Sequence, residues 1–300
     1  MSQYRAHFNA VVYFTNGGSL STDGFRLDVP NELVDSSDVT RLLIQHLGLA
    51  LVGRVELTDL EIFEEAHKGS RGIPVVNEVE NVRLVDLSHE IEAGKITYPG
   101  LPAPIITPHL TREKSKSIYA PGTEFAMDII TMIGNTGTYL DSPYHRYDTG
   151  ADLAALELCT LVNLRAEVFH LDDSIERGIP AEVFYDRNLT GAAVLLHTGW
   201  NQHFGSAEYG VNAPFLTEAG ARHLVEAGVQ LVGIDSVNID DTQSGGTRPA
   251  HSLLLAAGIH VVEHLTNLGE LPSQGARFTA VPPKIKNFGT FPVRAFAEIA

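Results

Sequence analysis

Between residues 190 and 265 the chain alternates between apolar runs of strand length and segments with helical spacing, and this alternation strongly constrains the fold. The continuous apolar runs AAVLLHTGW and QLVGIDSVNID predict buried strands. LTEAGARHLVEAG has a capping threonine and helical periodicity, and SLLLAAGIHVVEHL reads as a helix followed by a strand. Helices that alternate with buried strands are typical of α/β folds. The sequence therefore predicts an α/β protein.

The N-terminal part has a different pattern. HFNAVVYF and FRLDV have strand composition and are separated by Asn-Gly-Gly, which tolerates positive φ, so we expect a hairpin. VTRLLIQHL has helical spacing and follows Ser37 and Asp38, which are N-cap types; Gly48 follows as a stop signal. One short helix is therefore expected after the hairpin.

The segment HKGSRGIPVVNEVEN, residues 67–81, is rich in Gly, Pro and charge, which is typical of a linker. We therefore place a domain boundary near residue 80. The chain is expected to contain a small N-terminal α+β domain of unknown role, residues 1–80, and a larger domain, residues 81–300.

The composition excludes several classes of partner. With 37 acidic against 21 basic residues the formal net charge is −16, and such a surface repels nucleic acids and anionic membranes. The first residues do not resemble a signal peptide, and no run of about 18 apolar residues predicts a membrane span. The single cysteine, Cys159, fits a reducing compartment, and its setting LELCTL predicts core packing. We expect a cytoplasmic protein.

The stretch NTGTYLDSPYH, Asn135 to His145, follows the strand-like DIITMIG directly, which places it at a strand end. Asp141 and His145 offer a carboxylate and an imidazole, the groups that ligate metals or transfer protons in hydrolytic sites. On spacing alone, an aspartate that caps its own turn is the alternative. A functional site requires more such groups to converge from elsewhere in the chain.

His251 and Glu263 are candidates for this convergence. Glu263 interrupts the apolar run IHVVEHL, where an unpaired carboxylate is costly to bury. It therefore lies at an exposed strand end or is neutralised by a cation. By period-two alternation His260 and His264 lie on the opposite strand face, and we interpret both as ordinary half-buried histidines.

Four segments, in this order, resemble the cyclase superfamily, which includes bacterial kynurenine formamidase (arylformamidase) and isatin hydrolase. They are VDLSHEI with TYPGLPAP, NTGTYLDSPYH, LLHTGW, and GIDSVNID followed by His251 and Glu263. The resemblance covers roughly residues 82–300 and identifies residues 81–300 as an arylformamidase-like catalytic domain. It implies a swivelling β/β/α arrangement for the core of that domain.

NTGTYLDSPYH is similar to the family motif HxGTHxDxPxH, but two histidines of the motif are replaced. In the family these two histidines are metal ligands, and here Asn135 and Tyr139 stand at their positions. Asp141 matches the aspartate at the third ligand position. His145 matches the final histidine, which the resemblance implies to be the acid/base group.

The resemblance also implies that His251 and Glu263 complete the metal site, so that three ligands remain together with Asp141. Three protein ligands are the number found in catalytic zinc sites that keep one position for water. We expect one divalent ion, zinc or manganese; a family member that has lost its metal is the alternative.

The two replaced positions are expected to contact substrate. Tyr139 would donate a hydrogen bond to a developing oxyanion or protonate a leaving group, and Asn135 would orient a carbonyl. Arg248, in the polar run TQSGGTRP, would bind a substrate carboxylate, and a solvated loop arginine is the alternative.

The favoured function is a metal-dependent hydrolase that opens a small amide, lactam or lactone, in which metal-activated water attacks the carbonyl and His145 moves protons. The first alternative is a cyclase, dehydratase or isomerase that uses Tyr139 and His145 as acid/base groups. The second is a non-catalytic binding or regulatory protein. The expected partner is a small-molecule substrate, and the resemblance implies a homodimer or larger homo-oligomer.

Overall fold

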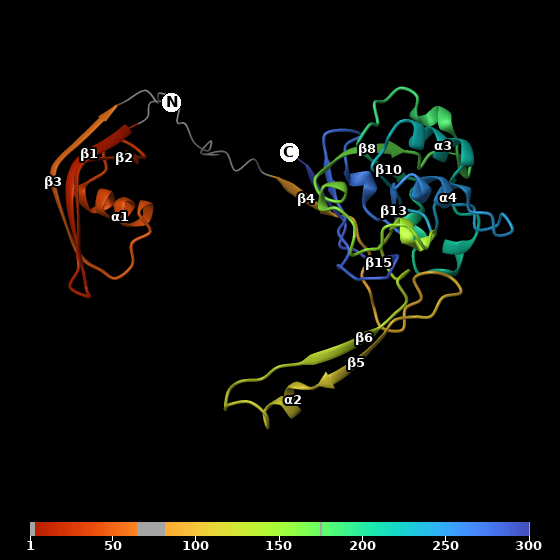
Figure 1. Ribbon diagram of the computed structural model, residues 1–300, viewed down its shortest axis with the longest axis horizontal. Helices are drawn as coiled ribbons and strands as arrows, with labels where there is room; N and C mark the ends of the chain where they lie inside the picture. Colours follow the sequence, from red (N-terminus) through yellow and green to blue (C-terminus); the bar gives the residue numbers. More distant parts are fainter. Residues whose placement is uncertain (1–3, 65–81, 175, 300) are drawn as a thin grey trace. The chain divides into compact units, whose positions relative to one another are not determined.

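The computed structural model describes residues 4–64, 82–174 and 176–299, and the chain divides into two compact units, Met1–Glu78 and Val79–Ala300 (Figure 1). Each unit has a hydrophobic core of its own. The predicted linker, residues 67–81, lies outside the described residues.

In the N-terminal unit a three-stranded antiparallel sheet packs against one helix. The elements are β1 (Tyr4–Phe14), β2 (Ser19–Val29), α1 (Ser36–His46) and β3 (Val52–Glu64), with β1 in the centre of the sheet. Alternate side chains of β1, from Ala6 to Val12, form one buried cluster with Val39 and Leu43 of α1. The predicted hairpin and helix are confirmed, but Asp35 caps the helix in place of Ser37 or Asp38, and the third strand was not foreseen.

The second unit is built on a nine-stranded mixed sheet. In spatial order its strands are β15 (Thr290–Pro292), β7 (Tyr139–Asp141), β13 (His260–Glu263), β12 (Leu231–Ile234), β10 (Ala193–His197), β8 (Leu164–His170), β14 (Arg277–Thr279), β16 (Phe296–Ile299) and β4 (Arg83–Asp86). The four central strands, from β13 to β8, are parallel, and every pair outside them is antiparallel. The α/β prediction is confirmed.

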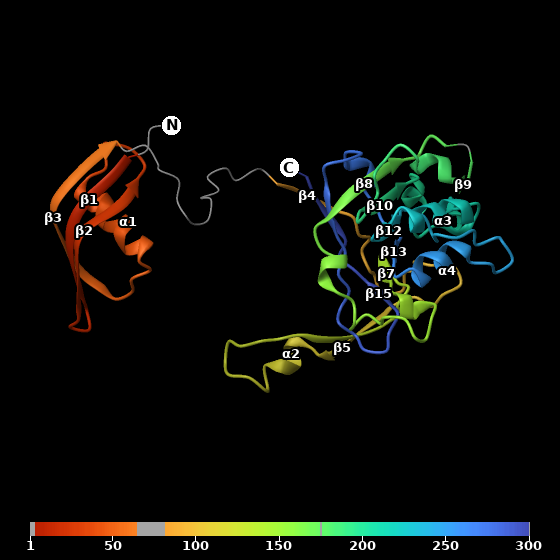
Figure 2. The same cartoon turned by 45° about the horizontal axis from the view of Figure 1, so that its top comes forward.

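Two helices, α3 (Glu218–Glu226) and α4 (Pro249–Ala256), lie side by side against one face of the parallel strands (Figure 2). Side chains of the parallel strands alternate between two cores because strand residues point to opposite faces in turn. In β10, for example, Val194 and Leu196 pack with the helices, whereas Ala193 and Leu195 pack in the core of the other face. Thr217 caps α3 through its side chain, as the sequence predicted.

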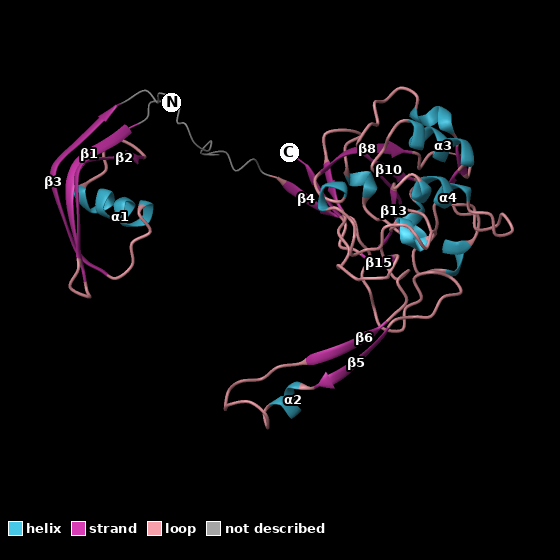
Figure 3. Ribbon diagram, viewed as in Figure 1, coloured by secondary structure: helices cyan, strands magenta, loops and turns pink. Residues whose placement is uncertain are grey.

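A hairpin made of β5 (Ile105–Leu110) and β6 (Met127–Thr131), with the short helix α2 (Arg112–Ser115) between its strands, extends from this unit (Figure 3). Strands β9 (Gly178–Ile179) and β11 (Phe215–Leu216) form a further small parallel pair.

Three details differ from the sequence predictions. The strand before the motif ends at Thr131, and the motif contains a strand of its own, β7, followed by the 3₁₀ turn Pro143–His145. Cys159 is exposed and does not pack in the core. His260 and His264 are fully buried, not half-buried. None of the helices in the described residues is long and apolar enough to span a membrane.

Candidate active site

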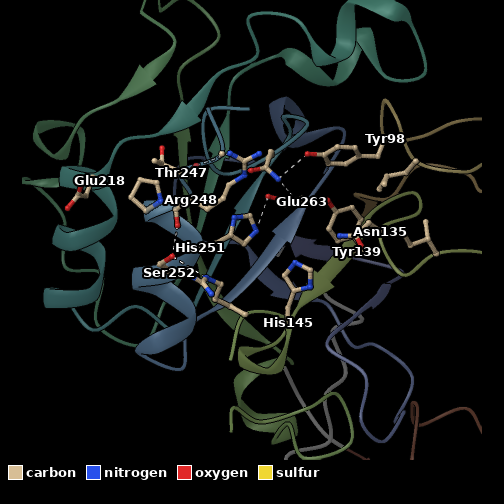
Figure 4. Close-up of a pocket in the computed structure, with 16 residues that line it drawn as sticks. Tyr98, Asn135, Tyr139, His145, Glu218, Thr247, Arg248, His251, Ser252 and Glu263 are labelled. Atoms are coloured by element: carbon tan, nitrogen blue, oxygen red, sulfur yellow. Dashed lines mark hydrogen bonds and ion pairs between the residues drawn. The ribbon is translucent and has the colours of Figure 1, made fainter. Parts of the chain in front are cut away.

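Three buried side chains from separate elements converge beside the sheet. Asp141 ends β7, Glu263 ends the neighbouring strand β13, and His251 lies in the first turn of α4. One ligand atom from each lies within 4.8 Å of the others. The Nε2 atom of His251 is 3.5 Å from Asp141 Oδ2. It is also 3.5 Å from Glu263 Oε1 (Figure 4). The structure thus brings the three predicted ligands together.

The electrostatics of this centre call for a cation between the two carboxylates. Burial raises the pKa of Glu263 to about 7, whereas the nearby His251 and His145 hold the pKa of Asp141 below its ordinary value despite its burial. Burial by itself lowers the pKa of His251, but the carboxylates of Glu263 and Asp141 raise it to about 10. Oδ2 of Asp141 is buried without a hydrogen-bond partner. In the metal-free protein the imidazolium therefore provides the positive charge.

The donor set suits a divalent metal. Two carboxylate oxygens and one imidazole nitrogen are ligands that zinc and manganese accept, and the unpartnered Oδ2 of Asp141 is an acceptor without a donor. A metal ion that replaced the proton of His251 would satisfy this atom. The residues present therefore fit the metal that the sequence predicts.

Asp240 orients His251. Its Oδ2 accepts a hydrogen bond from Nδ1 of His251 at 2.7 Å, and its two oxygens also accept the backbone N–H groups of Ala250 and His251. One carboxylate thus satisfies the N-terminus of α4 and fixes the proton of His251 on Nδ1, which leaves Nε2 facing the other two ligands. The neighbouring acids have different partners: Asp235 accepts from Thr198 and Gly199, and Asp241 pairs with Arg177.

Tyr139 supports Glu263 instead of facing the cavity with a free hydroxyl. Its side chain is fully buried, and its hydroxyl donates to Glu263 Oε2 at 2.5 Å. The other oxygen of Glu263 accepts the backbone N–H of Ile239 at 2.6 Å. Burial and the adjacent Glu263 raise the pKa of Tyr139 well above 10, so its hydroxyl keeps its proton at neutral pH. These contacts disfavour the predicted acid/base role and give Tyr139 a positioning role.

His145 lies at the edge of the centre, with 37% of its side chain exposed. Its Nδ1 is 2.6 Å from the hydroxyl of Thr290, which donates to Oδ1 of Asp141. Because a hydroxyl has one proton to give, it accepts from Nδ1–H of His145; in the tautomer with its proton on Nδ1, the lone pair lies on Nε2. Gly289 permits this contact, since a Cβ there would lie 2.6 Å from the backbone of His145.

A cavity of about 900 Å³ is lined by two of the three ligands, His251 and Glu263, and by His145. Asn135, Tyr139 and Arg248, the predicted substrate contacts, all line it, as does Tyr98 (Figure 4). The guanidinium of Arg248 also donates to backbone carbonyls of its own loop, which fixes its position at the cavity wall. All the predicted site residues except Asp141 therefore line one cavity.

His260 and His264 take no part in this centre. Nε2 of His260 is 2.9 Å from the hydroxyl of Thr160, and Nε2 of His264 is 3.0 Å from the carbonyl of Val237. Burial lowers their pKa values to about 4 and about 3, so both are neutral.

Two residues that support the site were not predicted from the sequence. Thr290 lies in the unremarkable segment FGTFP and gave no signal. Asp240 ends the segment GIDSVNID, and its contact with His251 depends on the fold.

Comparisons with known proteins place the larger unit in a family. Residues 85–241 match the family model described as putative cyclase. A kynurenine formamidase of Geobacillus thermodenitrificans is 32% identical over 168 residues, which cover 55% of this chain and 77% of the formamidase. An isatin hydrolase of Roseibium aggregatum is 26% identical over 217 residues, covering 64% of this chain and 82% of that protein.

Solved structures resemble the larger unit as well. An isatin hydrolase bound to the product analogue thioisatinate has a TM-score of 0.63 at 22% identity and covers 73% of this chain and 92% of its own. A potential metal-dependent hydrolase with cyclase activity has a TM-score of 0.59 at 25% identity, covering 73% of this chain and 98% of its own.

Proposed function

This chain belongs to the putative cyclase family, and from this premise we propose that it is a metal-dependent hydrolase that opens a small amide, lactam or lactone at Asp141, His251 and Glu263. The similar formamidase and isatin hydrolases are named for amide substrates, and hydrolysis of a non-peptide C–N bond is the activity that this chain shares with them. The convergence of three buried ligand atoms is the observation that carries the proposal.

One divalent ion, zinc or manganese, is proposed to bind Oδ2 of Asp141, Nε2 of His251 and Glu263. Such an ion supplies Lewis acidity, which polarises a carbonyl and lowers the pKa of water. Asn135 and Tyr139, which replace histidines of the family motif, are not counted as ligands: the phenol of Tyr139 already donates to Glu263, and Asn135 lines the cavity.

Side chains around the cavity transfer protons and bind the substrate. His145 presents a lone pair on Nε2, so it accepts a proton from the attacking water and returns it to the leaving nitrogen or oxygen. Arg248 offers a cation to a carboxylate or carbonyl of the substrate, and Asn135 offers an amide to orient it. Replacing His145 by Ala is expected to lower kcat by about 10²- to 10⁴-fold.

The proposal is tested with an aryl formamide and isatin as substrates and elemental analysis of the purified protein. Asp141→Asn should lose one metal ion per chain and the hydrolysis of whichever substrate is accepted. Asp148→Asn, which changes an exposed acid of the same loop, should keep both. Full hydrolase activity in Asp141→Asn would contradict the proposal.

The alternative in which Tyr139 acts as the acid/base group of a cyclase, dehydratase or isomerase is disfavoured by its contact with Glu263 and its raised pKa. Tyr139→Phe should therefore keep the pH profile of kcat and lose metal affinity. Loss of turnover in this variant, together with turnover that survives chelation, would support the alternative instead. The complete set of ligands, with Asp240 behind His251, disfavours a non-catalytic role. The proposed compartment is the cytoplasm, consistent with the single cysteine.

We also propose that the protein is a homodimer or a larger homo-oligomer. Both strands of the β5–β6 hairpin are exposed, and an isolated two-stranded hairpin is marginally stable in water. Its exposed apolar side chains include Ile105, Ile106, Phe125, Met127, Ile129 and Ile130. A second copy of the chain would cover them. Light scattering should show an oligomer that Ile106→Glu dissociates and the control Thr107→Ser leaves intact; a monomeric wild type would contradict this.

A further inference from the structure

We propose that His170, Asp172 and His197 form a second metal site, which binds zinc outside the cavity of the candidate active site. One ligand atom from each of the three lies within 4.8 Å of the others. The two Nδ1 atoms face each other at 3.0 Å, and Oδ1 of Asp172 is 3.6 Å from Nδ1 of His197.

The backbone fixes the two histidines in this arrangement. His170 ends β8 and His197 ends β10, and these parallel strands pair with the two histidines in direct register. The N–H of Leu171 then donates to the carbonyl of His197 at 2.7 Å, which extends the pairing by one residue. Registered residues of neighbouring strands point to the same side of a sheet, so the two imidazoles are aligned before any ion binds.

The chemistry of the three groups suits zinc. Zinc binds imidazole nitrogen and carboxylate oxygen in tetrahedral sites, and three protein ligands leave one position for water. His170 is exposed and 49% of the Asp172 side chain is exposed, so water and ions reach the group from solvent. The lone pairs of the two facing Nδ1 atoms repel each other unless a proton or a metal ion lies between them. The nearby carboxylate of Asp172 adds a third ligand and favours the metal ion.

This group is separate from the candidate active site. Strand β12 lies between β10 and β13, so roughly 10 Å of sheet separates His197 from Glu263. A different cavity, of about 580 Å³, adjoins the group; Asp172 and Thr198 line it, and it shares no lining residue with the cavity of the active site. We therefore assign the ion a structural role, in which it ties the segment after β8 to the end of β10.

Zinc counting by equilibrium dialysis and elemental analysis tests the site. His170→Ala and Asp172→Asn should each bind one zinc ion fewer per chain than wild type, or bind that ion at least about 10-fold more weakly, since even the loss of an outer partner of a metal ligand costs that much. Both variants should keep the wild-type hydrolase activity. The control His109→Ala removes an exposed histidine of the β5 strand that belongs to no such group, and should bind as much zinc as wild type.

A second readout separates this ion from the catalytic one. In Asp141→Asn, which lacks a ligand of the active site, added zinc should raise the melting temperature, and a further His170→Ala change should abolish the rise. Failure of the hydrolase proposal would leave this result unchanged. If His170→Ala and wild type bind equal zinc, or if the zinc-dependent rise survives the double substitution, the histidines share only a proton and the site is refuted.

Discussion

Two groups of imidazole and carboxylate ligands stand on the same sheet and differ mainly in burial. Asp141, His251 and Glu263 are nearly inaccessible, with at most 8% of any side chain exposed. His170 and Asp172 face solvent instead. In the buried group, solvent does not screen the charges of the two carboxylates. These charges keep the imidazole of His251 protonated, with a pKa of about 10. Burial therefore makes a charge partner obligatory in one group and optional in the other.

Removing the imidazole of the buried group should have the largest effect on stability. In chelated protein at neutral pH, His251→Ala leaves Asp141 and Glu263 facing each other without a cation, and should lower the free energy of unfolding by about 3–5 kcal/mol. Urea titration of the larger unit measures this change. Ser252→Ala, one residue further along α4, should cost less than about 1.5 kcal/mol. Equal losses in the two variants would show that the centre needs no positive charge.

Asp240→Asn should weaken the buried centre without removing a ligand. The amide would place an N–H₂ group either against the backbone N–H of Ala250 or against the backbone N–H and Nδ1–H of His251, which now donate to the two carboxylate oxygens. We expect metal affinity to fall about 10- to 100-fold and activity to return at high metal concentration. Asp241→Asn is the matched control, because Asp241 contacts Arg177 and not His251. Unchanged metal affinity in Asp240→Asn would contradict the orienting role.

The pH dependence of stability should distinguish the chelated from the metal-loaded protein. The pKa values of Glu263 and His251 are raised to about 7 and about 10, so both groups hold protons more tightly in the folded chain. Their stabilising contribution is present at low pH and is lost as pH rises through about 7 and then through about 10. The lowered pKa of Asp141 acts oppositely: its contribution is present above its ordinary value and is lost as pH falls.

A bound metal replaces these protons, so its competition with them weakens as pH rises. The difference in melting temperature between metal-loaded and chelated protein should therefore widen from pH 6 to pH 9, by about 5 °C or more. In Asp141→Asn/His170→Ala, which lacks a ligand of each proposed site, the gap should stay nearly constant. If the difference in melting temperature narrows as pH rises in the wild type, the metal does not displace the proton of His251, and the assignment is refuted.

The sequence predicted the parts of the fold and the site that depend on local pattern. The alternation around α3, β12, α4 and β13 was visible because each element is apolar at its own period, and Glu263 stood out as a charge within an apolar run. Asp141 and His251 were candidates by residue type, and the motif resemblance implied that both are metal ligands. All three ligands lie at the ends of strands or at the start of a helix, where the pattern changes from apolar to polar.

The remaining features depend on contacts between distant residues. The Thr290 hydroxyl meets Asp141 across 149 positions of sequence, and no local pattern encodes that pairing. Strand β3 mixes charged and apolar residues because one of its faces is open, so it lacks a clear period. Cys159 was placed in the core because leucines surround it, but the 3₁₀ turn Leu158–Thr160 directs it outward. The contact between Tyr139 and Glu263 could not be foreseen, because the two residues lie 124 positions apart.

The smallest change in the free energy of unfolding is expected for the exposed group, His170, Asp172 and His197. In chelated protein, His170→Ala should change the free energy of unfolding by less than about 0.5 kcal/mol, because the side chain is exposed and its partner His197 can donate to water instead. Adding zinc should then separate His170→Ala from wild type, since only the wild type gains the binding energy of the second ion. Urea titrations with and without zinc measure both terms. A large loss in the absence of zinc would mean that the exposed histidines stabilise the fold by themselves, and burial alone would then not distinguish the two groups.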